Sequence, residues 1–192
     1  MKYIKMFSLA ATALMAFAGI ASANIQLTAP AGTVVKTGTT ISLSLKPKTS
    51  MVLSDTAGFV QDTCTISSVS AKTSNEFGAT ITGSIETLTF SNCIRLTKTL
   101  ANGTLHIGTN GTVTSSSSRV QRETSTGAIC VYGTGAGTHL GTLTNAASST
   151  GHASLVINAV LPLIETISGS CVSDVRRKAE YTVTSPLGLI AD

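Results

Sequence analysis

Residues 79–90 read ATITGSIETLTF, a run in which apolar and polar side chains alternate. Ile81 and Ile85 share one parity, whereas Leu88 falls on the other. Successive side chains of a β-strand point to opposite faces, so a change of parity marks an irregularity in the strand. This run therefore predicts a half-buried strand with a bulge or kink near residues 86–87.

The same alternation recurs along the chain at a spacing of about 8 to 12 residues, with turn residues between the runs. Pro162 argues against a helix in the longest run. This pattern predicts an all-β protein, a single-domain antiparallel β-sandwich of the Ig-like, Greek-key type. The predicted strands lie in residues 39–45, 64–70, 79–90, 103–108, 111–115, 118–123, 127–133, 140–144, 153–167 and 179–185.

The first 23 residues have the pattern of a secretory signal peptide. Lys2 and Lys5 give a positive start, residues 6–20 are apolar, and Ala21-Ser22-Ala23 is the small-residue pattern that signal peptidase cleaves. We therefore expect cleavage near Ala23 and a secreted location, which is extracellular, on the cell surface or periplasmic. No later apolar run is long enough to span a bilayer.

The rest of the chain has the length of one domain. Residues 24–63 precede the first cysteine and form a strand-rich arm, and residues 64–192 form the disulfide-bonded sandwich. Two interpretations of the arm are open at this point. Its strands either join the same sandwich, which we favour, or pair with a neighbouring molecule by strand addition.

Cys64, Cys93, Cys130 and Cys171 are the four cysteines of the chain. An even number of cysteines in an exported chain predicts two disulfides. Three pairings are possible, and we favour Cys64–Cys93 with Cys130–Cys171 because each closes a modest loop around one run of strands. The spacings match no zinc pattern.

The charge of the chain gives little support for a nucleic-acid partner. The net charge is +4, and without Lys2 and Lys5 there are 11 basic and 9 acidic residues, a net charge of +2. The chain has no Trp, and its basic residues are few. Nucleic-acid binders concentrate basic residues on one face and interleave aromatics. Abundant Thr and Ser with only 11% charged residues instead indicate an extracellular β-protein.

Residues 130–143, CVYGTGAGTHLGTL, most resemble a phosphate-binding loop. A dinucleotide fingerprint would need a third glycine where Thr138 or Leu140 stands, and a P-loop would need a lysine that this segment lacks. The following residues read as a strand. We therefore predict a glycine-widened β-hairpin here and no cofactor.

The chain shows no catalytic or metal-binding motif. His106, His139 and His152 each lack a second ligand at metal spacing, the serine elbow GxSxG is absent, and no two carboxylates stand in a suggestive context. We therefore predict a protein that is not an enzyme and holds no metal. A secreted hydrolase, assembled from distant residues, is the third hypothesis.

Residues 174–180, DVRRKAE, are the densest charge cluster. Arg176, Arg177 and Lys178 are candidates for contact with an anionic polysaccharide or lipid headgroup. A solvated turn before the last strand is the simpler interpretation, and we favour it.

The order of the cysteines and the pattern of strands and turns in residues 64–186 suggest a family. The pattern CTISSVS…ATITGSIETLTFSNC, then GAICVYGTG…LGTLT, then a cysteine before AEYTVTSP, resembles bacterial secreted β-proteins described as protein activators of alkane oxidation. This resemblance implies an exported surface or extracellular accessory protein without catalytic residues. It would act at hydrophobic surfaces, in adhesion or in a biofilm matrix.

The chain also resembles fimbrial subunits, which are exported, Thr-rich, disulfide-bonded β-sandwiches with an N-terminal arm. It departs from them in residues 186–192, which continue past the last predicted strand, and in having four cysteines. This resemblance implies a subunit that polymerises by strand addition, and it is the alternative function. The expected partners are the protein itself, other surface proteins, or hydrophobic or polysaccharide surfaces.

Overall fold

The computed structural model describes residues 24–30 and 32–191. The predicted signal peptide lies outside these residues. The described part of the chain is all-β, with 65% of the described residues in strands and one 3₁₀ turn at Thr109–Gly111. Asn110 in this turn has a φ of 60°, in the left-handed region that asparagine tolerates.

The strands are antiparallel to their partners throughout the described residues. Their bounds are β1 Ile25–Ala29, β2 Thr33–Val34, β3 Thr40–Leu45, β4 Met51–Ser54, β5 Val60–Thr73, β6 Phe77–Gly78, β7 Thr80–Cys93, β8 Thr97–Ala101, β9 Thr104–Gly108, β10 Thr112–Ser116, β11 Arg119–Glu123, β12 Ile129–Gly133, β13 Thr138–Thr144, β14 Ser154–Ser168, β15 Asp174–Ser185 and β16 Ile190–Ala191.

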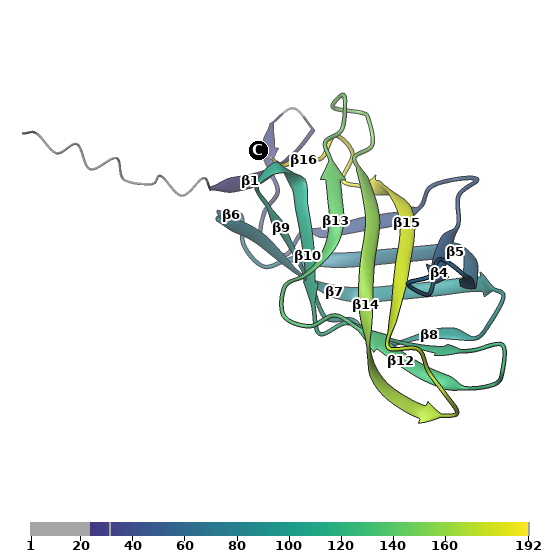
Figure 1. Cartoon of the computed structure of the whole chain (residues 1–192). Helices are drawn as coiled ribbons and strands as arrows, with labels where there is room; N and C mark the ends of the chain where they lie inside the picture. Colours follow the sequence, from purple (N-terminus) through teal and green to yellow (C-terminus); the bar gives the residue numbers. More distant parts are fainter. Residues whose placement is uncertain (1–23, 31, 192) are drawn as a thin grey trace, which may run out of the picture.

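Strand pairing closes the main sheet into a ring (Figure 1). Along the path β5-β7-β9-β10-β13-β14-β15, each strand pairs with the next one in the list. Strand β15 then pairs with β3 and β4, and both of these pair with β5. The ring is therefore a meander joined by hydrogen bonds all the way round, and not the Ig-like Greek-key sandwich that we expected.

Three long strands, β5, β14 and β15, allow this closure, because each is long enough to meet different partners at its two ends. The first half of β14 pairs with β13 through residues 154–157, and its second half pairs with β12 through residues 163–168. Strands β11 and β8 extend the sheet beyond β12.

The predicted hairpin in residues 130–143 is wrong. Strands β12 and β13 lie end to end along β14 and do not pair with each other. The link between them instead bonds to the β10–β11 turn, where Thr134 N donates to Ser118 O at 2.9 Å. The glycines let the backbone pass close to its neighbours, as at Gly133, where an added Cβ would lie 2.5 Å from Ser118 O.

The predicted bulge in β7 is confirmed. Ser70 of β5 faces Thr87, but the next residue of β5, Ala71, faces Ile85, so Glu86 is the additional residue. The bulge keeps Ile85 and Leu88 both in the core, where they are 8% and 7% exposed. It also lies just beyond the point where β7 stops pairing with β9.

The strands of the arm, residues 24–63, pair with other strands of the same chain. Strands β3 and β4 belong to the ring, whereas β1 pairs with β2, β6 and β16 at one end of it. Leu27 of β1 is only 1% exposed and Leu189 is equally buried, so this end of the ring is covered by apolar side chains. Within the described residues, no helix is both long and apolar enough to cross a membrane.

Candidate functional site

The end of the molecule opposite β1 and β16 carries both disulfides, and we call it the disulfide end (Figure 1). Backbone hydrogen bonds join the β7–β8 turn there to β5 and to the end of β11. Ile94 N donates to Thr63 O at 3.0 Å, and Glu123 N donates to Leu96 O at 2.9 Å. The disulfide end consists of residues 55–60, 93–97, 123–129 and 167–174.

The disulfides join Cys64 to Cys93 and Cys130 to Cys171, the pairing that we favoured from the sequence. The first links β5 and β7 directly across the sheet, and the second ties β12 to the β14–β15 turn. Each is expected to stabilise the fold by about 4 kcal/mol through restriction of the unfolded chain. Such bonds indicate an oxidising compartment.

Large apolar side chains are exposed at the disulfide end. Phe59 is 72% exposed, Ile94 is 69% exposed and Leu96 is 58% exposed. Val60, Ile167 and Val172 are exposed beside them. Single exposed apolar residues are ordinary, whereas a group of them at one end of a molecule is a candidate interaction surface.

Strand β14 extends this surface along the outside of the ring. Its outward side chains include Val156, Val160 and Ile164, each more than 40% exposed. Residues four apart in a strand lie on the same face, so these three form one row.

The basic cluster of residues 174–180 lies within β15, so the predicted solvated turn is wrong. Alternation along the strand sends Arg176 and Lys178 outward and buries Arg177. Arg176 and Lys178 line a surface hollow of about 180 Å³ with Asp55 and Val60, next to the disulfide end. Arg177 is only 7% exposed, so the sequence prediction of a surface contact does not hold for it.

Asp62 is the residue that holds the disulfide end together from inside. It is 1% exposed, and its carboxylate accepts hydrogen bonds from Thr63 N at 2.8 Å, Arg95 N at 3.0 Å and Thr97 Oγ1 at 2.6 Å. These bonds fix the β7–β8 turn, which carries two of the exposed apolar residues, against the start of β5. Asp62 lies near the sulfurs of Cys64 and Cys93, but both sulfurs are in a disulfide and do not offer thiolate ligands.

Burial shifts the pKa of two ionisable groups near this end. Desolvation lowers the pKa of Arg122 and raises the pKa of Tyr132. The Tyr132 hydroxyl donates to Val172 O at 3.1 Å and so helps to hold the β14–β15 turn.

His106 of β9 and His139 of β13 lie on the two sides of β10, both opposite Thr114, and the hydrogen-bond partners of His106 and His152 are neutral. Both ring nitrogens of His106 lie near threonine hydroxyls, those of Thr82 and Thr104. Nδ1 of His152 lies 2.7 Å from Val183 O, and His139 is exposed on β13. Within residues 24–30 and 32–191, no histidine is hydrogen-bonded to a carboxylate, so no Ser-His-Asp arrangement is formed there.

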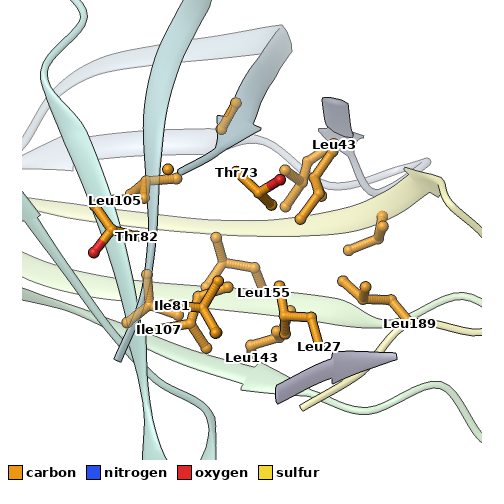
Figure 2. Close-up of a pocket in the computed structure, with 15 residues that line it drawn as sticks. Leu27, Leu43, Thr73, Ile81, Thr82, Leu105, Ile107, Leu143, Leu155 and Leu189 are labelled. Atoms are coloured by element: carbon orange, nitrogen blue, oxygen red, sulfur yellow. The ribbon is translucent and has the colours of Figure 1, made fainter. Parts of the chain in front are cut away.

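The interior of the ring is closely filled. The pocket in Figure 2 has a volume of about 40 Å³, room for little more than one water molecule, and side chains such as Leu43, Leu105 and Leu155 form its walls. A wider hollow of about 730 Å³ lies at the opposite end, near Asn24 and the β9–β10 turn, and its described lining has no charged side chain.

The closed antiparallel sheet and the two disulfides define the class, an all-β protein stabilised by disulfides and suited to an oxidising compartment. Comparison of the chain with protein-family models, curated proteins and solved structures gave no match. The functional argument therefore rests on the chain's own residues.

Proposed function

We propose that this chain is an exported, non-enzymatic surface or extracellular accessory protein that binds hydrophobic surfaces through its disulfide end. Residues 1–23 act as the signal peptide in this proposal. The observation that carries it is the group of exposed apolar side chains on adjoining turns, led by Phe59, Ile94 and Leu96.

The energy available to this surface is sufficient for adsorption. Burial of a large apolar side chain contributes about 1.5 to 3 kcal/mol. Three such side chains on turns already fixed by hydrogen bonds lose little conformational freedom when they bind. The Asp62 bonds and the Tyr132 bond hold the turns in place before contact.

Adsorption to hexadecane droplets tests this proposal. The purified oxidised protein is mixed with an emulsion, and the protein remaining in the water phase is measured. We expect the double variant Phe59→Ser with Ile94→Ser to adsorb at least about tenfold more weakly than the wild type, because two apolar anchors are lost.

Phe77→Ser is the matched control. Phe77 is 68% exposed, nearly as much as Phe59, but it lies in β6, away from the disulfide end. Its variant should adsorb like the wild type. An equal loss of adsorption in the Phe77→Ser variant and in the double variant would show non-specific adsorption and would refute a role for the disulfide end.

The fimbria-like alternative has one observation in its favour, a strand edge at β8, which pairs with β11 alone among the described strands. The arm offers less support, because β1, β3 and β4 are already paired within the chain. Deletion of residues 24–53 would remove ring strands and unfold the protein, so the intact chain is the better subject. Fibres of the wild type in electron microscopy, with a polymer peak in size-exclusion chromatography, would favour the alternative, and a monomer without fibres would favour our proposal.

A further inference from the structure

Three charged side chains are buried in the described part of the chain, and their charges do not balance. Asp62 and Arg122 are each 1% exposed, and Arg177 is 7% exposed. Two guanidinium groups therefore face one carboxylate in the interior. A buried charge without a partner is costly.

The carboxylate does not neutralise either arginine by direct contact. The ion pairs formed by the described residues are Lys36–Glu76 and Lys46–Glu180, both at the surface. Asp62 instead receives its hydrogen bonds from backbone N–H groups and a threonine hydroxyl.

The two buried arginines retain unused hydrogen-bond donors. Arg122 Nη2 donates to Gln61 O at 2.8 Å, but its Nε and Nη1 have no acceptor among the described residues. Arg177 Nη2 donates to the Tyr181 hydroxyl at 2.7 Å, while its Nε has no acceptor there. Three buried guanidinium nitrogens, which carry four N–H donors, are thus unsatisfied, an uncommon condition in a folded protein.

Both arginines line the same small cavity. Its walls also include Thr97, Phe90 and Tyr132, and its volume is about 10 Å³. The Phe90 ring lies 5.1 Å from the Arg177 guanidinium carbon and covers one side of that group. This space accommodates one small particle about the size of a water molecule.

We propose that this cavity is a binding site for a single small monovalent anion, physiologically chloride. Because both arginines line the cavity, an anion there would accept hydrogen bonds from their unsatisfied donors and would supply negative charge. A water molecule would satisfy some of the donors but would leave the charge unbalanced. Sulfate, phosphate and carboxylates are too large for the cavity.

Chloride-dependent stability tests this proposal on the full oxidised protein. Urea unfolding is measured in sodium chloride and in sodium gluconate at equal concentrations, because gluconate is too large to enter the cavity. We expect the urea midpoint to be higher in chloride and to rise with the logarithm of its concentration, since the anion binds the folded chain alone.

The variants separate this site from general salt effects. Arg122→Met should lose the chloride dependence, whereas Arg119→Met, on the exposed side of the same strand, should keep it. Crystals grown in sodium bromide give a second readout that needs no variant. We expect an anomalous bromide peak between Arg122 and Arg177.

Equal midpoints in chloride and gluconate would overturn the proposal. A bromide-grown crystal without a peak between the two arginines would also overturn it, even if Arg122→Met fails to fold. Loss of the chloride effect in Arg119→Met would contradict the assignment to this cavity.

Discussion

At the scale of single residues, Asp62 connects the fold to the proposed function. Its burial could not be inferred from the sequence QDTCT, where an acidic residue two positions before a cysteine looks like an ordinary solvent-exposed strand residue. Its three donors come from residues 63, 95 and 97, and two of these become neighbours only through the pairing of β5 with β7.

Removal of the Asp62 carboxylate should weaken the whole fold. We expect Asp62→Ala to lower the free energy of unfolding by about 3 kcal/mol or more, because buried donors lose a charged acceptor. Urea unfolding measures this change. Glu86→Ala, at an exposed carboxylate of β7, should change it by less than about 0.5 kcal/mol. Equal stability of the two variants would show that the Asp62 bonds contribute nothing.

The two exposed phenylalanines show what residue type alone cannot reveal. Phe59 and Phe77 both stand beside glycine and turn residues, and the sequence gives no reason to prefer one of them. Only the fold places Phe59 at the disulfide end and Phe77 in β6, which pairs with β1 at the other end. Whether exposed apolar side chains form a group depends on which distant turns lie at the same end of the molecule. Local sequence patterns do not determine this.

At the scale of elements, alternation predicted most of the long strands and the bulge at Glu86, but no predicted range covered β4 or β8. It succeeded because the face of each side chain is a local property of the backbone. It failed for the basic cluster, where charged residues suggested a turn. Arg177 is placed in the interior because the inward face of β15, with Val175 and Tyr181, has the same parity.

The glycines of residues 130–143 have distinct roles that substitution can separate. A Cβ added at Gly141 would lie 1.8 Å from Val156 O on β14, whereas at Gly135 the nearest atom would be 3.9 Å away. We expect Gly141→Ala to lower the free energy of unfolding by about 3 kcal/mol or more, and Gly135→Ala by less than about 0.5 kcal/mol. Thermal or urea unfolding measures both. A stable Gly141→Ala variant would refute the close approach of β13 and β14.

At the scale of the whole molecule, the sequence predicted the all-β class and favoured the disulfide pairing, but not the closed ring. Ring closure depends on β15 meeting β3 and β4, which lie more than 120 residues earlier in the chain. The alternation of apolar and polar residues does not determine which strands pair with each other. A meander and a Greek key therefore have similar sequences, and the connections alone distinguish them.

The disulfide end is likewise a property of the whole molecule, because four turns from separate parts of the chain form it. The most direct test is hydrogen exchange of the wild-type protein, free and adsorbed to hydrophobic droplets, followed by mass spectrometry. We predict slower amide exchange on adsorption in residues 55–60 and 94–97, with no change in residues 74–79. Slower exchange confined to residues 74–79, or no slowing in any segment, would contradict binding through the disulfide end.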